Sequence, residues 1–209
     1  MAQAAAWLED LLEDEGPFDG IFGFSQGAAL TLSYVYQQQL LGNPVGIKFA
    51  CLFSTAAPCS PDLNMGDAII SKLRALEYDI TDRAGTIGKD LTVAEQEFVS
   101  ILQQTIVEAA FQGTPIPYSD TDIYRYGERE AIPCVMMPSL LTQKIRIPTV
   151  HVWGQNDFEY MIKMSGLAHS LCDESLAKTV LHTGLHDVPK RRPEIKAVLR
   201  AIDWAMARA

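Results

Sequence analysis

Short apolar runs alternate with amphipathic stretches along most of this 209-residue chain. Apolar runs at 18–24, 47–53, 149–153 and 179–181 predict strands, the first of them buried. The stretches between them place apolar residues at helical spacing. The clearest such stretch lies at the N-terminus and ends at Gly16-Pro17. Strands that alternate with helices predict an α/β fold, in which helices cover both faces of a parallel sheet.

The segment from about 64 to 141 interrupts this alternation. Residues 68–76 and 93–111 have helical spacing, and the later part is irregular. This irregular part contains several Pro, Tyr and Met residues, namely Pro115, Pro117, Tyr118, Tyr124, Tyr126, Pro133, Met136, Met137 and Pro138. We interpret the segment as an insertion within a single domain, 1–209. It forms either a lid whose Met and Tyr side chains line an apolar acyl pocket or a decoration that only packs on the core. Its attachment at strand ends favours the lid.

Composition excludes several classes of partner. The net charge is −9 and the pI is near 4.9, so a nucleic-acid partner is not expected. No apolar stretch approaches the ~20 residues that span a bilayer, and the N-terminus lacks a leader pattern, so we expect a cytoplasmic protein. The cysteines lack C-x-x-C spacing, which predicts buried free thiols at Cys51, Cys59, Cys134 and Cys172. We expect no metal and no cofactor.

The motif Gly23-Phe24-Ser25-Gln26-Gly27 has the G-x-S-x-G form, and it lies where an apolar strand meets a helical pattern. This context predicts a serine nucleophile on a sharp strand-to-helix turn. Gly23 and Gly27 are expected to give the turn its room. The backbone N–H of Gln26 is expected to stabilise an oxyanion at the helix start. The alternative is a structural Gly-Ser turn, which the flanking strand and helix disfavour.

A serine hydroxyl needs a base, and that base needs a carboxylate to orient it. Asp157 lies on the loop that follows the strand at 149–153, and His186 lies on the loop that follows the strand at 179–181. This order, Ser then Asp then His, is the one found in α/β-hydrolases. A turn or cap role remains the alternative for Asp157, and His182 is the second candidate for the base. The remaining histidines, His151 and His169, fall within a strand and a helix, where a structural role is the simpler interpretation.

Four segments together resemble the fungal FSH family of serine hydrolases, which includes thioesterases that release polyketides from their synthases. They are GFSQGAA (23–29), IKFACLFSTAAP (47–58), PTVHVWGQND (148–157) and HTGLHDVP (182–189). The resemblance implies an α/β-hydrolase fold and a triad of Ser25, Asp157 and His186. Leu185 departs from the glycine that usually precedes the family's histidine. We expect the acyl group to contact Phe24, Met136 and Met137.

The family also begins with strands and an oxyanion loop that have no counterpart before residue 1 here. The sequence-based expectation is therefore a sheet without its N-terminal strands. Three explanations stay open: a truncated sequence, a homodimer that covers the exposed sheet edge, or a protein that lost activity.

The leading hypothesis is an acyl hydrolase that acts through an acyl-enzyme on a hydrophobic ester or thioester, either free or attached to a carrier protein. One alternative is an N-truncated hydrolase-fold protein that acts as an interaction module. The other is an acyltransferase that uses the same triad.

Overall fold

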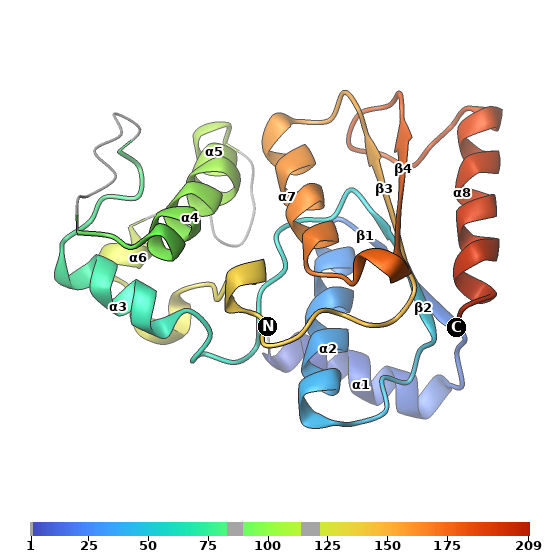
Figure 1. The fold of residues 1–209 in the computed structure, drawn as a ribbon, viewed down its shortest axis with the longest axis horizontal. Helices are drawn as coiled ribbons and strands as arrows, with labels where there is room; N and C mark the ends of the chain where they lie inside the picture. Colours follow the sequence, from blue (N-terminus) through green and yellow to red (C-terminus); the bar gives the residue numbers. More distant parts are fainter. Residues whose placement is uncertain (1, 83–89, 114–121) are drawn as a thin grey trace.

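The computed structural model describes residues 2–82, 90–113 and 122–209 (Figure 1). Its sheet has the order β1-β2-β3-β4 and every neighbouring pair is parallel. The strands are β1 (Gly20–Phe24), β2 (Phe49–Phe53), β3 (Thr149–Gly154) and β4 (Ala177–His182). All the strands expected from the apolar runs are confirmed, as is the α/β class. Among the residues expected in the irregular segment, Pro115, Pro117 and Tyr118 lie outside the described residues.

Helices cover both faces of this sheet, as expected. They are α1 (Ala2–Glu15), α2 (Gln26–Leu41), α7 (Glu159–Ser170) and α8 (Arg192–Met206), with a short 3₁₀ helix at Glu174–Leu176. Figure 1 shows α8 on one side of the sheet and α2 and α7 on the other. One apolar core forms between α8 and the inner strands β2 and β3. A second forms where α1, α2 and α7 pack on the opposite face.

Strand β1 lies at the edge of the described sheet, next to β2. The prediction of a buried strand was wrong for its aromatic side chains, because Phe22 is 59% exposed and Phe24 is 43% exposed. An apolar run looks the same in a central and in an edge strand, and only the strand order distinguishes them.

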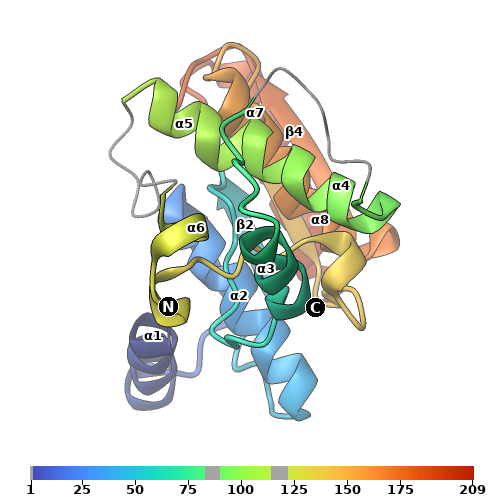
Figure 2. The ribbon, with the colours of Figure 1, turned by 90° about the vertical axis from the view of Figure 1, so that its left-hand side faces the viewer.

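The predicted insertion lies between β2 and β3, and Figures 1 and 2 show two of its helices, α4 and α5, beside α7. They are α3 (Asp67–Ala75), α4 (Val93–Leu102), a π-helical turn (Gln103–Val107), α5 (Glu108–Phe111) and α6 (Ile123–Tyr126), with 3₁₀ turns at Arg129–Ala131 and Pro138–Leu140. A capping box at Thr92 and Glu95 starts α4. The insertion shares an apolar core with α7 that includes Phe98, Leu102 and Met161.

All four cysteines are free and buried, as predicted. Burial raises the pKa of the Cys51 thiol to about 12, which keeps it protonated and unreactive. Within the described ranges, no helix combines the length and the apolar character needed to cross a bilayer.

Candidate active site

The loops that follow β1, β3 and β4 carry Ser25, Asp157 and His186. Since all the strands run parallel, their carboxyl ends lie at one edge of the sheet. The topology therefore brings together residues that are up to 161 positions apart in the sequence.

Ser25 occupies the turn between β1 and α2 with φ 52 and ψ −113. A left-handed backbone of this kind costs ~1–3 kcal/mol in a residue with a side chain, so the surrounding structure must hold it. The Ser25 N–H donates to the Phe53 carbonyl at 2.8 Å, and its own carbonyl accepts from the Ala56 N–H at 3.2 Å. These bonds tie the turn to the end of β2. The geometry is that of a nucleophile elbow.

The two motif glycines differ in what surrounds them. A Cβ on Gly23 would lie 2.6 Å from the Ala28 Cα, so only glycine allows β1 and α2 to approach this closely. A Cβ on Gly27 would meet nothing within 4 Å. The expectation that both glycines give the turn its room is confirmed for Gly23 and wrong for Gly27, which faces open space on the first turn of α2.

A chain of hydrogen bonds joins the serine, the histidine and the aspartate. His186 Nε2 lies 3.2 Å from Ser25 Oγ, and His186 Nδ1 lies 2.9 Å from Asp157 Oδ2. The Asp157 side chain is fully buried, and its other oxygen accepts from the Phe158 N–H at 2.8 Å. Since an ionised carboxylate only accepts, Nδ1 carries the proton and Nε2 is free to accept from the Ser25 hydroxyl. This is the tautomer that a general base requires.

Gln26 is the first residue of α2. The first helical hydrogen bond of this turn runs from the Ala29 N–H to the Ser25 carbonyl, so the N–H of Gln26 precedes the helical bonding pattern. Free N–H groups and the helix dipole both favour negative charge at this end. Its expected role as an oxyanion donor has the right local setting.

The residues expected to contact substrate separate into two groups. The Phe24 ring lies 5.0 Å from the His186 ring and is 43% exposed. Met136 and Met137 are 0% exposed and belong to the apolar cores, so the structure does not bring their side chains to the surface of the site. The Met136 N–H donates to the Pro58 carbonyl, which ties this segment to the loop after β2. Apolar character predicted contact with substrate, but both side chains pack inside the protein.

The other histidines lie apart from this hydrogen-bond chain. His182 ends β4 and is 1% exposed. His151 is fully buried, and burial together with the nearby His169 lowers its pKa to about 3, so it is neutral. The described part of the chain shows no group of three or more His, Cys, Asp or Glu side chains arranged to hold a metal ion.

Gly154 is a positioning feature that the sequence analysis did not identify. A Cβ there would lie 2.3 Å from the Leu185 carbonyl oxygen and 2.4 Å from that of Gly184. Glycine therefore lets the loop that carries Asp157 pack directly against the loop that carries His186. The signal available in the sequence was a glycine at the end of a strand, three residues before the candidate acid.

Known proteins with similar sequences include an esterase and a serine hydrolase. The sequence profile of the family described as serine hydrolase (FSH1) matches residues 1–198. Esterase alnB of Emericella nidulans is 34% identical over 204 residues, which cover 95% of this chain and 70% of that protein. Serine hydrolase cnsH of Penicillium expansum is 28% identical and covers 98% of this chain and 84% of its own length.

Among solved structures, the esterase RhEst1 from Rhodococcus sp. ECU1013 aligns with a TM-score of 0.49 at 12% identity. The alignment covers 99% of this chain and 72% of RhEst1. Because the family profile spans nearly the whole chain and esterase alnB is 34% identical over 95% of it, the chain belongs to the FSH1 family of serine hydrolases.

Proposed function

We propose that this protein hydrolyses esters or thioesters of hydrophobic acyl groups, with Ser25 as nucleophile, His186 as general base and acid, and Asp157 as the group that orients the imidazole. The observation that carries the proposal is the hydrogen-bond chain from Ser25 Oγ through both ring nitrogens of His186 to the buried Asp157 carboxylate. Family membership and the esterase relative support the same activity.

In the first half-reaction, Ser25 Oγ forms a bond to the acyl carbonyl carbon while its proton passes to His186 Nε2. The carbonyl oxygen becomes an oxyanion near the N-terminus of α2, where the N–H of Gln26 stabilises it. The intermediate then collapses, the bond to the leaving oxygen or sulfur breaks, and His186 returns the proton to the leaving group. Water attacks the acyl-enzyme through the same steps and regenerates Ser25.

The preference for an apolar substrate is supported by the side chains next to the three reactive residues. Phe24 precedes Ser25, Phe158 follows Asp157 and Leu185 precedes His186, and they are 43%, 56% and 65% exposed. The Phe24 ring also lies 5.0 Å from the His186 ring. Exposed large apolar groups give a hydrocarbon chain a surface that it covers favourably. A charged or sugar-like acyl group gains nothing from such a rim.

The insertion is proposed to border the acyl site as a lid. Its apolar core includes Ala29 and Ala56, and the Ala56 N–H donates to the Ser25 carbonyl. The insertion therefore adjoins the turn that carries Ser25 through Ala29 and Ala56. Its helices α4 and α5 lie beside α7 (Figure 2). Binding through the β1 edge, by a second copy of the chain, and delivery of the acyl group on a carrier protein remain predictions.

The direct experiment is labelling with a fluorophosphonate probe, which forms a covalent bond with an activated serine. Ser25→Ala is expected to abolish labelling and to lower kcat for p-nitrophenyl esters by at least ~10³-fold. Ser54→Ala is the matched control, since Ser54 also has a left-handed backbone, at φ 41, and a fully buried side chain. We expect it to label like the wild type.

Two outcomes would overturn the proposal. A wild-type protein that is folded by circular dichroism yet neither labels nor turns over esters or thioesters would not be a serine hydrolase of this mechanism. A Ser25→Ala variant that keeps wild-type turnover would place the nucleophile elsewhere. Turnover that rises with acyl chain length supports the apolar rim, and a flat profile contradicts it.

A further inference from the structure

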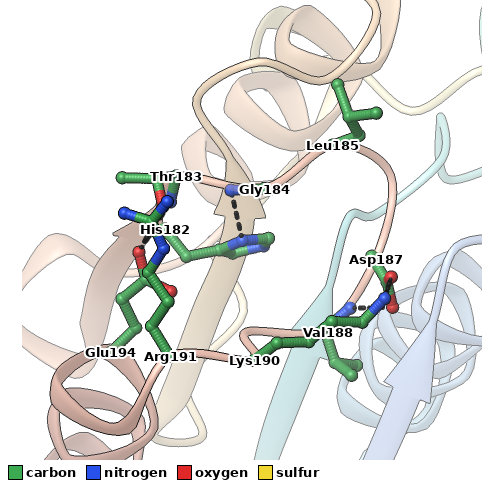
Figure 3. A pocket seen from close by; sticks show the side chains of 9 residues that line it. All are labelled: His182, Thr183, Gly184, Leu185, Asp187, Val188, Lys190, Arg191 and Glu194. Carbon is green, nitrogen blue, oxygen red and sulfur yellow. Dashed lines mark hydrogen bonds and ion pairs between the residues drawn. The ribbon is translucent and has the colours of Figure 1, made fainter.

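The loop that carries His186 has a cavity inside its curve. The cavity has a volume of about 310 Å³ and is lined by His182, Thr183, Gly184, Leu185, Asp187, Val188, Lys190, Arg191 and Glu194 (Figure 3). The Leu185 and Val188 side chains are 65% and 44% exposed, so neither buries the loop in the core. Apolar packing therefore contributes little to the position of the imidazole, and other contacts must fix it.

Those contacts are hydrogen bonds. The Glu194 carboxylate accepts from the Thr183 N–H at 2.9 Å and from the Thr183 hydroxyl at 2.7 Å. Two further residues, His182 and Asn156, bond to the segment from either side of the loop. His182 Nδ1 accepts from the Gly184 N–H at 3.1 Å, and Figure 3 shows the ring pointing into the curve of the loop. On the other side, the Asn156 N–H donates to the Gly184 carbonyl at 3.2 Å. The Asn156 side chain also donates, from Nδ2 to the Thr183 carbonyl at 2.9 Å. Both residues thus hold the same short segment, 183–184, which a single residue, Leu185, separates from His186.

The hydrogen bond from the Gly184 N–H also defines the tautomer of the His182 ring. A backbone N–H can only donate, so Nδ1 must be without a proton and Nε2 must carry it. His182 is 1% exposed, and its Nε2 has no hydrogen-bond partner in the described residues. A buried donor without a partner is costly. The hydrogen bond that the ring does make is on its acceptor side, to the loop that carries His186.

We propose that His182 and Asn156 are positioning residues. They hold the loop that carries His186, the base loop, against the loop that carries Asp157, the acid loop, and so set the distance between His186 Nε2 and Ser25 Oγ. Asn156 directly precedes Asp157, so it belongs to the acid loop and donates hydrogen bonds to the base loop. Without these contacts, Glu194 still holds Thr183, but the N–H and the carbonyl of Gly184 lose the partners that fix the path of the chain toward His186. A displacement of about 1 Å at a reacting group can cost ~10²-fold in rate. This inference rests on the proposed function of the triad.

The first test compares His182→Phe with His182→Asn. Phenylalanine keeps a ring of similar size but has no acceptor, whereas asparagine places Oδ1, which is bonded to Cγ as Nδ1 is, opposite the Gly184 N–H. We expect His182→Phe to lower kcat by ~10- to 100-fold with KM changed less than about twofold. His182→Asn is expected to recover most of the lost kcat even though it leaves a larger void. Thr179→Ala, an exposed position on the same strand, is the control.

Asn156 provides a second, smaller arm of the test. Asn156→Asp keeps the shape of the side chain but replaces the donor to the Thr183 carbonyl by an acceptor, while the backbone bond to Gly184 remains. We expect kcat to fall several-fold and KM to change little. Asn156→Ser, which restores a hydroxyl donor on a shorter side chain, is expected to lie between Asn156→Asp and the wild type.

A purely structural role is distinguished by the proton on His186 Nδ1, which is shared with Asp157 and gives a downfield NMR resonance in the folded enzyme. We expect this resonance to shift or broaden in His182→Phe and to return in His182→Asn, at temperatures well below the melting point of each variant. An unchanged resonance and unchanged kcat in both His182→Phe and Asn156→Asp would overturn the inference. A parallel loss of kcat and of folded fraction, with no rescue by asparagine, would also overturn it.

Failure of this inference is separable from failure of the proposed function. If the wild-type enzyme does not label at Ser25, the triad itself is refuted. If the wild type labels and turns over normally but His182→Phe and Asn156→Asp do the same, only the positioning role is refuted.

Discussion

The site at the strand ends and the helical insertion are held together by different forces. Around Ser25, Asp157 and His186 the structure relies on backbone hydrogen bonds and on the close approach of loops, as at Gly23 and Gly154. The insertion relies on a large apolar core in which side chains such as Phe98 and Leu102 are almost fully buried. One region is fixed by direction-dependent contacts and the other by the area that it removes from water.

This difference has a consequence for how substitutions act in the two regions. Hydrogen bonds specify position to a fraction of an ångström but add only ~0.5–1.5 kcal/mol each to stability. A buried apolar side chain adds ~1.5–3 kcal/mol but tolerates small shifts. We therefore expect the loss of a hydrogen bond at the strand ends to change rate more than stability, and substitutions in the insertion to change stability more than rate.

The largest expected effect on stability comes from Leu102→Ala in the insertion. Leu102 is 0% exposed and lies in the shared core, so its truncation leaves a cavity and is expected to cost ~2–5 kcal/mol in the free energy of unfolding. Denaturant titration measures this loss, and fluorophosphonate labelling measures Ser25 in the folded fraction. We expect the labelling rate per folded molecule to stay within about twofold of wild type. A large loss of labelling at full folding would show that the two regions are not separable.

The next effect sharpens the picture of the elbow. Gly23→Ala forces a Cβ to within 2.6 Å of Ala28 Cα, whereas Gly27→Ala enters open space. We expect Gly23→Ala to destabilise the fold by ~1–3 kcal/mol or more and to lower the labelling rate of Ser25, since strand and helix must separate. Gly27→Ala is expected to keep or raise stability, by up to ~1 kcal/mol, because alanine is the better helix former. Equal melting temperatures for the two variants would contradict this account.

The most gradual effect is the response of stability to pH through His151 in β3, because it accumulates over several pH units. Its pKa is lowered to about 3 by burial, with a smaller contribution from His169, while the unfolded chain has the ordinary value near 6.5. Below pH 6.5 the unfolded state binds a proton that the folded state refuses. The contribution of this residue is therefore complete above pH 6.5 and is lost as the pH falls toward 3, at up to ~1.4 kcal/mol per pH unit.

Replacing His151 by leucine is expected to flatten this part of the stability profile, measured by urea titration between pH 4 and 7. Leu102→Ala lacks a titratable change and is expected to shift the whole profile downward without altering its slope. If the slope of the wild type persists in His151→Leu, other groups are responsible for it.

Much of the architecture follows from local patterns in the sequence. The apolar runs that became β2, β3 and β4 and the helical spacing of α2 and of residues 93–111 depend on neighbours along the chain, which the sequence contains. Ser25, Asp157 and His186 each follow a strand. The sequence alone therefore also predicts that they lie close together, because parallel strands present their carboxyl ends at one edge of the sheet.

Other features depended on contacts between distant segments. Apolar residues were correctly identified, but the sequence did not show that Phe22 and Phe24 face outward on an edge strand while Met136 and Met137 face inward. Gly23 and Gly27 looked equivalent in the motif, and only the path of α2 distinguished them. The sequence predicted that His182 packs at the end of its strand. Its hydrogen bond with the Gly184 N–H depends on the path of the loop after β4, which the sequence does not specify.

The sequence by itself determined the class of fold, the strand ends and the residues able to carry the chemistry, because these follow from periodicity, from the covalent order of the chain and from the chemistry of each side chain. The tertiary structure alone decided which apolar groups are buried, which glycine is required and how the base loop is held. Those properties depend on distances between segments that lie far apart in the chain, and neither periodicity nor composition specifies them.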